Sequence, residues 1–171
     1  MALQIILCME TNKRAATDYI YIRETINRFY EINNKIKISP VYMNTKTRYK
    51  SKDVIKEINR LQRDYKIGDT KAIYCIDTDL YESNAEHASD LKSISDFCKE
   101  NEYDMIWFCH DIEEVYLERR ISDKEKVAES GKFRNKNMIQ SISENMLSCE
   151  NIRLRSSNIL LVLDKYLKRR D

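Results

Sequence analysis

The sequence predicts an α/β protein built on a mainly parallel sheet of four or more strands, with helices on both faces of the sheet. Apolar runs of strand length alternate along the chain with longer segments of helical character. Parallel strands need crossover connections, so this alternation is typical of successive strand–helix–strand units. Right-handed crossovers would bring the carboxyl ends of the strands to one crevice, where such sheets bind their ligands.

The bulk composition narrows the class of protein. A chain of 171 residues can bury a core, and we expect one domain over 1–171, with its core over 1–120 and C-terminal helices over 135–171. The 30 Lys and Arg nearly balance the 28 Asp and Glu, so binding to nucleic acid would have to rely on local basic patches. The five cysteines form no CxxC pair, which argues against a structural zinc site and fits a reducing cytoplasm. We expect neither a signal peptide nor a membrane-spanning stretch.

The first half of the chain predicts two strands and two helices. The first apolar run leads directly into Glu10. Pro40 interrupts the second strand pattern and favours a place near the sheet edge, and Ser51 is a suitable N-cap for the second helix. The predicted elements are, in order, a strand over 3–9, a helix over 15–33, a strand over 35–43 and a helix over 51–65.

The second half of the chain predicts two further strands and several helices. Gly68 and Asp69 predict a turn before the third strand. The segment 122–137 is polar and basic, so we expect a loop or a poorly packed segment there. The predicted regular elements are strands over 72–77 and 103–109 and helices over 85–101, 112–120, 138–147 and 158–170.

Three carboxylates that follow predicted strands form a candidate metal site. Asp77 and Asp79 come directly after an apolar run, and Glu10 follows the first strand. Carboxylates held close together repel one another unless a proton or a cation lies between them, and Mg²⁺ or Mn²⁺ suits such oxygen ligands. We therefore interpret Glu10, Asp77 and Asp79 as catalytic, metal-binding residues. The alternative is a polar turn after a strand, where Asp is common in any case.

Polar residues also follow the fourth predicted strand. His110, Asp111 and Glu114 could support the site or contribute a metal ligand, with His110 as a candidate general base. Local hydrogen bonding is the alternative role for His110. Glu113 and Glu114 equally suit the first turn of a helix, where the helix dipole favours acidic residues.

Four basic residues are candidate phosphate contacts. Lys13 and Arg14 follow Glu10 along the chain. Lys132 and Arg134 lie in the polar segment near the C-terminus. Each could meet a phosphate group, and the alternative for each is a solvated surface residue. The sequence has no glycine-rich phosphate loop, which argues against an ATPase or a dinucleotide-binding fold.

Short motifs across most of the chain resemble TOPRIM-type proteins, in particular the RloB-like group linked to bacterial phage-defence and restriction loci. The segment IILCMETNKRAATDYI resembles that group's opening, where Glu10, Lys13 and Tyr19 correspond to its motif. AIYCIDTD resembles its apolar strand with Asp-x-Asp, and MIWFCHDIEEVYL resembles a later strand followed by Phe-Glu-x-Trp, where Glu114 corresponds. RSSNILLVLDKYL resembles the group's last helix. The glycine that follows the first acid in the family is Thr11 in this chain.

The resemblance implies a Rossmann-like TOPRIM sheet, Mg²⁺ held by Asp77 and Asp79, and Glu10 as acid or base in phosphodiester chemistry. It therefore implies a cytoplasmic, metal-dependent nuclease that acts on DNA or RNA. Two alternatives stay open. Thr11 in place of glycine favours a catalytically degenerate module that binds nucleic acid or a partner ATPase. IDTDLYES resembles the first motif of haloacid-dehalogenase phosphatases, although that motif should open the domain.

Overall fold

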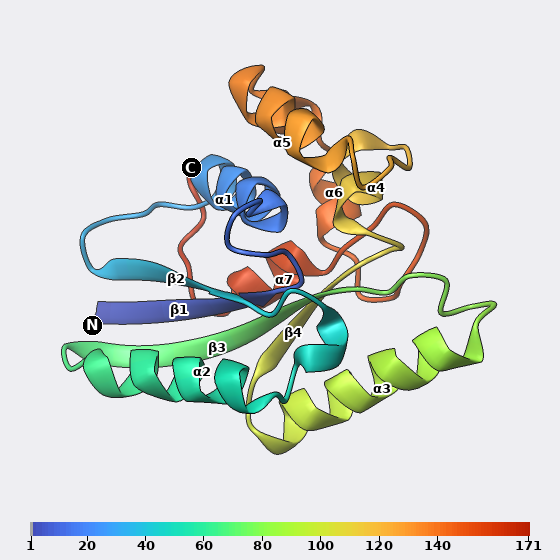
Figure 1. Cartoon of the computed structure of the whole chain (residues 1–171). Helices are drawn as coiled ribbons and strands as arrows, with labels where there is room; N and C mark the ends of the chain where they lie inside the picture. The colour runs from blue at the N-terminus through green and yellow to red at the C-terminus, as the bar shows by residue number, and fades with distance from the viewer. Residues whose placement is uncertain (1) are drawn as a thin grey trace.

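A four-stranded, all-parallel sheet forms the centre of the computed structural model, which describes residues 2–171 (Figure 1). β1 and β3 are neighbours and pair from Ala2 opposite Gly68 to Met9 opposite Cys75. The predicted α/β class is confirmed, and the strands that lead to Glu10 and Asp77 lie side by side. In the order β2-β1-β3-β4, the strands are β1 (Ala2–Met9), β2 (Ile36–Tyr42), β3 (Gly68–Asp77) and β4 (Asp104–Phe108).

Helices cover both faces of the sheet, as the sequence predicts. On one face lie α1 (Thr17–Phe29) and the C-terminal segment with α7 (Ile159–Leu163), whereas α2 (Lys52–Asp64) and α3 (Ala85–Glu100) cover the other face (Figure 1). The alternation of side chains along β1 divides the core accordingly. One apolar cluster contains Ile5, Leu7 and Met9 with α1 and α7 residues, and the second contains Ile6 and Cys8 with α2 and α3 residues.

The connections place a topological switch point at the carboxyl ends of β1 and β3. From β1 the chain passes through α1 to β2, at one edge of the sheet, and from β3 it passes through α3 to β4, at the opposite edge. Open α/β sheets bind ligands where neighbouring strands send the chain in opposite directions. The fold therefore indicates this end of the sheet as the place to look for a site.

Two local predictions in the first half of the chain are confirmed. β2 lies at the sheet edge, where the missing N–H of Pro40 costs no interior ladder bond. The Ser51 side chain accepts a hydrogen bond from the Val54 N–H at 3.4 Å, and α2 begins at the next residue. The 3₁₀ turn η1 (Lys46–Arg48) connects β2 to this cap.

The loop predicted over 122–137 is wrong where α5 (Lys126–Asn135) forms, although most side chains of the segment are exposed. This helix follows α4 (Ile112–Leu117) and packs on α1. Phe133 is fully buried, with its ring centroid 4.9 Å from that of Tyr21 and 5.6 Å from that of Tyr116. A single aromatic anchor gives no apolar period along the chain, so the sequence pattern does not reveal this helix.

Gly68 opens β3, and the turn predicted there is wrong. A Cβ at this position would lie 1.9 Å from the carbonyl oxygen of Ala2, so the close approach of β3 to β1 requires glycine.

The predicted closing helices are also too long. Only η2 (Met138–Ser141), α6 (Glu144–Leu147) and α7 form, and the last residues instead make an antiparallel bridge between Arg169 and Tyr30. Hydrogen bonds to the end of α1 thus replace helical ones.

The cysteines lie in the interior of the protein. All five cysteines are buried and free, as expected for thiols that pack as small apolar groups. No helix among residues 2–171 has the length and the apolar character that a membrane span requires.

Candidate functional site

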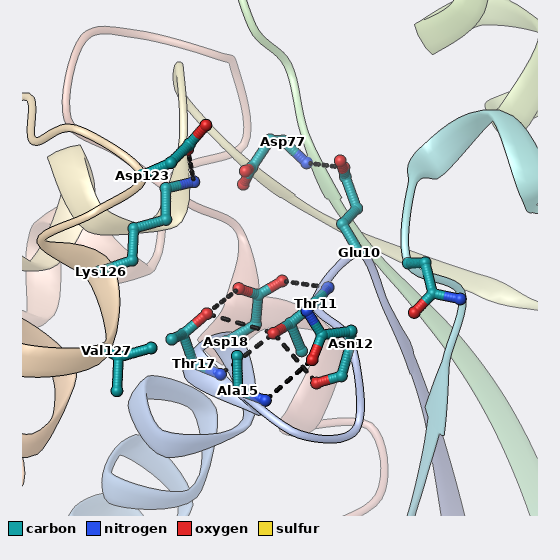
Figure 2. Close-up of a pocket in the computed structure, with 11 residues that line it drawn as sticks. Glu10, Thr11, Asn12, Ala15, Thr17, Asp18, Asp77, Asp123, Lys126 and Val127 are labelled. Carbon is teal, nitrogen blue, oxygen red and sulfur yellow. Dashed lines mark hydrogen bonds and ion pairs between the residues drawn. The ribbon is translucent and has the colours of Figure 1, made fainter.

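A polar pocket of about 380 Å³ lies beyond the carboxyl ends of β1 and β3 (Figure 2). The loop after β1, the first turn of α1, the end of β3 and the start of α5 form its walls. Its charged lining consists of Glu10, Asp18, Asp77, Asp123 and Lys126. Two of the three predicted metal ligands, Glu10 and Asp77, therefore meet at the switch point.

Glu10 and Asp77 are linked directly. Glu10 Oε1 accepts a hydrogen bond from the Asp77 N–H at 2.7 Å, and Asp77 Oδ1 accepts one from the Ile112 N–H at 2.9 Å. Because Met9 pairs with Cys75, the first residue past β1 lies at the level of Ile76, within reach of the Asp77 N–H at the end of β3. Backbone hydrogen bonds thus orient both carboxylates.

Asp18 is a pocket carboxylate that the sequence prediction misses. Its two oxygens accept hydrogen bonds from the Thr11 N–H and the Thr17 hydroxyl, both at 3.3 Å. The loop that delivers Thr11 is closed by Asn12, whose side-chain oxygen accepts a hydrogen bond from the Ala15 N–H at 2.8 Å (Figure 2). In the sequence, Asp18 resembles any acid in the first turn of a helix, so only its burial distinguishes it.

Glu113 adds a carboxylate with unsatisfied hydrogen-bonding capacity. The residue is 0% exposed, and neither of its carboxylate oxygens has a hydrogen-bond partner. Lys126 Nζ lies 3.5 Å from Glu113 Oε2 and forms an ion pair with it. A buried carboxylate with vacant lone pairs is costly, and an additional cation would relieve that cost.

These four residues, Glu10, Asp18, Asp77 and Glu113, are called the acid cluster below. Burial raises the pKa of Asp77 well above its usual range, and the charges of the other three raise it further. Burial also raises the pKa of Glu10 to about 8, although the Asp77 N–H and Lys46 favour its charged form. The pKa of Glu113 rises to about 7, again mainly through burial. Without a cation, the surroundings of the cluster therefore disfavour the charged form of these acids and favour the protonated form.

Lys126 supplies positive charge to the acid cluster. Its ammonium lies 3.5 Å from Glu113 and 3.6 Å from Asp123, and Figure 2 shows it across the pocket from Glu10. Burial alone would lower the pKa of Lys126, but the surrounding carboxylates outweigh burial and raise it. The sequence gives no signal for this residue because α5 itself is not predicted.

Asp79 lies outside the pocket. Its carboxylate is paired with Lys46, whose side chain is only 8% exposed and which also donates a hydrogen bond to the Asp77 carbonyl oxygen at 3.2 Å. The Asp79 backbone has a φ of 49°, and its N–H donates to the His110 carbonyl oxygen at 2.8 Å. The two aspartates of the Asp-x-Asp motif thus have different electrostatic partners.

The polar residues after β4 lie beside the pocket but do not line it. Asp111 caps α4 by accepting a hydrogen bond from the Glu114 N–H at 2.7 Å. Glu114 Oε2 lies 3.3 Å from His110 Nδ1 and 3.2 Å from Arg120 Nε. Of the two adjacent glutamates, Glu113 raises the pKa of Asp77, whereas Glu114 forms an ion pair with Arg120.

The predicted phosphate contacts are exposed on two elements that flank the pocket. Lys13 and Arg14 lie on the loop after β1, and Lys132 and Arg134 lie on α5. Lys13 borders a neighbouring groove of about 510 Å³, and Lys132 Nζ lies 3.8 Å from a Glu129 carboxylate oxygen. None of these four side chains lines the acidic pocket itself.

One trio of potential ligands within residues 2–171 has its ligand atoms all within 4.8 Å of one another, and it consists of Glu82, Cys109 and His110. The predicted trio of Glu10, Asp77 and Asp79 does not converge to that extent.

Comparison with protein-family models, with curated proteins and with solved structures found no match to this chain. The resemblance to TOPRIM-type proteins therefore stays a prediction based on short motifs.

Proposed function

We propose that this protein is a divalent-cation-dependent phosphodiesterase of the TOPRIM nuclease type. The observation that carries the proposal is the junction of Glu10 and Asp77 on neighbouring parallel strands, inside a cluster of buried acids. Such a cluster at a switch point suits a cation and an anionic substrate better than it suits an apolar ligand. Nucleic acid in the cytoplasm, with a role in phage defence, is the setting that the motif resemblance favours.

The residues present fit Mg²⁺ or Mn²⁺. Glu10 and Asp77 would hold the ion, since Mg²⁺ is usually bound by one or two carboxylates and keeps several waters. Glu113 lies beside the pocket and is paired with Lys126, and its two oxygens, which accept no hydrogen bond, could accept one from a water of the ion. A divalent cation held there would stabilise charge on a phosphoryl oxygen and lower the pKa of a bound water.

The chain's own groups can supply proton transfer and substrate binding. Where Glu10 does not hold the ion, it is the candidate general acid or base, because its carboxylate lies beside Asp77 in the pocket. Lys126 would lie beside an incoming phosphate. Lys13, Arg14, Lys132 and Arg134 could contact further phosphates along a nucleic acid, because they are exposed on elements that flank the pocket.

The two alternatives differ in how well they agree with the geometry. A haloacid-dehalogenase mechanism would need Asp79 next to Asp77 in the pocket, whereas Asp79 pairs with Lys46 outside it. A degenerate module that binds nucleic acid or a partner ATPase would keep the acid cluster without cutting. An experiment that measures cleavage and metal binding separately distinguishes this binding module from a nuclease.

The experiment compares wild type with Asp77→Asn and with Asp69→Asn as a matched control. Asp69 lies on the same strand at its opposite end and is exposed. Single- and double-stranded DNA and RNA are incubated with Mg²⁺, Mn²⁺ or EDTA, and melting temperatures are measured in parallel. We expect metal-dependent cleavage by wild type and Asp69→Asn but not by Asp77→Asn. No cleavage together with a metal-dependent rise in melting temperature would favour the binding module, and the absence of both would end the metal proposal.

A further inference from the structure

The loops after β3 and β4 bring together three side chains with different donor atoms. Glu82 lies on the loop between β3 and α3, and Cys109 and His110 follow β4. Their potential ligand atoms all lie within 4.8 Å of one another, and His110 Nε2 is 3.2 Å from Glu82 Oε1. None of the three lines the acidic pocket, so the trio is separate from the site described above.

The donor chemistry points to a borderline-soft metal ion. Sulfur, imidazole nitrogen and carboxylate oxygen together suit Zn²⁺, whereas Mg²⁺ prefers oxygen ligands alone. With zinc–ligand bonds of about 2.0–2.3 Å, tetrahedral geometry separates the ligand atoms by roughly 3.3–3.7 Å. No pair in the trio therefore has to close by more than about 1.5 Å, a change within reach of side-chain rotation.

The surroundings of His110 orient its ring for such a role. Metal-binding histidines commonly donate their second ring N–H to a carboxylate, which fixes the tautomer. Glu114 Oε2 lies 3.3 Å from His110 Nδ1, while His110 Nε2 faces Glu82. Arg120 Nε donates to Glu114 Oε2 at 3.2 Å, and Arg120 Nη2 lies 3.2 Å from the same ring nitrogen, His110 Nδ1. The pair of Glu114 and Arg120, which the acidic pocket does not use, thus supports the ring from behind.

The surroundings of Cys109 and Glu82 complete the arrangement. The Cys109 N–H donates a hydrogen bond to the Ser156 carbonyl oxygen at 3.0 Å, which fixes the backbone that carries the thiol. Burial raises the pKa of the Cys109 thiol, but hydrogen bonds from the Thr78 side chain and the Arg155 backbone favour the thiolate. The Glu82 side chain is 48% exposed, so an ion can reach the trio from solvent.

We propose that Glu82, Cys109 and His110 bind a Zn²⁺ ion, with a water in the fourth position. The ion would link the β3–α3 loop to the β4–α4 loop. The sequence argues against a zinc site because it has no CxxC pair, but that rule detects only ligands that are close together in one segment. Here two separate loops supply the ligands, so the site becomes visible only in the fold.

The test uses the reduced full-length protein, freed of metal by chelation and titrated with Co²⁺ alone and with Zn²⁺ alone. We expect one equivalent of Co²⁺ bound by wild type to show a thiolate-to-cobalt charge-transfer absorption, which Zn²⁺ abolishes by displacement. Cys109→Ser should lose this absorption, whereas Cys98→Ser, with another buried cysteine on α3, should keep it. Glu114→Gln should weaken Zn²⁺ binding by about 10- to 100-fold without changing the stoichiometry.

Two further variants keep the proposal falsifiable. Asp77→Asn should keep the thiolate-to-cobalt absorption of wild type and its loss on addition of Zn²⁺, because the acidic pocket is a different site. Glu82→Gln alters an exposed side chain and should fold even if Cys109→Ser does not, and it should weaken Zn²⁺ binding by about 10-fold or more. The proposal is overturned if reduced wild type binds neither ion, if the thiolate absorption persists in Cys109→Ser, or if Glu82→Gln binds Zn²⁺ as tightly as wild type.

Discussion

The acid cluster and the carboxylates just outside it differ in how their charge is balanced. Outside the pocket, Asp79 is paired with Lys46, and Glu114 is paired with Arg120. In and beside the pocket, Lys126 lowers the pKa values of Asp18 and Glu113, and the Glu113 oxygens accept no hydrogen bond. Individually paired carboxylates can be explained by structure alone. The acids of the cluster have no such individual partners, and a cation could replace the protons that their raised pKa values favour.

The contrast is sharpest within one motif. Asp77 and Asp79 are separated only by Thr78, yet one lines the pocket and the other pairs with Lys46. The left-handed backbone of Asp79 turns the chain away after β3 ends. Proximity along the sequence therefore does not make two acids part of one site.

The largest effect should come from Asp77→Asn. We expect metal-dependent cleavage to fall by roughly 100-fold or more, because the variant removes a charged ligand of the proposed cation. Folding stability should stay level or rise, since Asn keeps an oxygen for the Ile112 N–H and relieves repulsion in the cluster. Cleavage rates and urea unfolding measure the two effects. An active Asp77→Asn enzyme would separate the acid cluster from catalysis.

The acid cluster should also control how stability depends on pH. Glu10 and Glu113 have folded-state pKa values of about 8 and about 7, above the ordinary value of 4.5. Between the ordinary and the folded-state pKa of each group, the folded protein therefore binds more protons than the unfolded chain. Metal-free protein should therefore lose stability as pH rises from 4.5 to about 8. The slope should reach up to about 1.4 kcal/mol per pH unit for each group.

Urea unfolding at several pH values, in the presence of EDTA, measures this slope. Glu10→Gln should flatten it, whereas the control Asp69→Asn should leave it unchanged. Stability that rises with pH across this window in wild type would contradict the unbalanced charge that we assign to the acid cluster.

A smaller effect, of opposite kind, is expected outside the pocket. Asp79→Asn should destabilise the protein by about 1–2 kcal/mol, because it leaves the buried Lys46 ammonium without its carboxylate. Cleavage and divalent-cation binding should persist. The double variant Asp79→Asn with Lys46→Met should regain part of the lost stability in urea unfolding. Loss of cleavage activity in Asp79→Asn would contradict this account and show that Asp79 contributes to the active site.

The smallest expected effect concerns Lys126. Lys126→Met removes an ammonium 3.5 Å from Glu113, so Mn²⁺ should bind about fivefold more tightly to the variant. Lys124→Met, at a neighbouring exposed position, is the matched control. Calorimetric titration with Mn²⁺ compares the two. Weaker binding to Lys126→Met would show that Lys126 supports the ion and does not compete with it.

The sequence predicts those parts of the molecule that depend on local pattern. Strand-length apolar runs that end in acids identified β1 and β3, and parallel pairing then brought Glu10 and Asp77 to one edge. The contribution of Asp18 could not be recognised, because an acid in the first turn of a helix is common for reasons of dipole alone.

Other features depend on contacts between distant segments. α5 packs through Phe133 against residues from α1 and α4, so neither the helix nor the place of Lys126 follows from the apolar pattern of its own sequence. Gly68 resembles a turn residue in the sequence, but the closeness of β1 is what requires it. The partner of Asp79 was equally hidden, since Lys46 lies on η1.

The most direct test of the central claim is a calorimetric titration of Mn²⁺ into protein that carries Cys109→Ser, so that the second candidate metal site cannot contribute. In this background we expect binding to the otherwise unchanged protein and to Asp79→Asn, and loss of binding in Glu10→Gln and in Asp77→Asn. Binding that survives in both Glu10→Gln and Asp77→Asn, or that disappears only in Asp79→Asn, would contradict the assignment of the cation to the acid cluster.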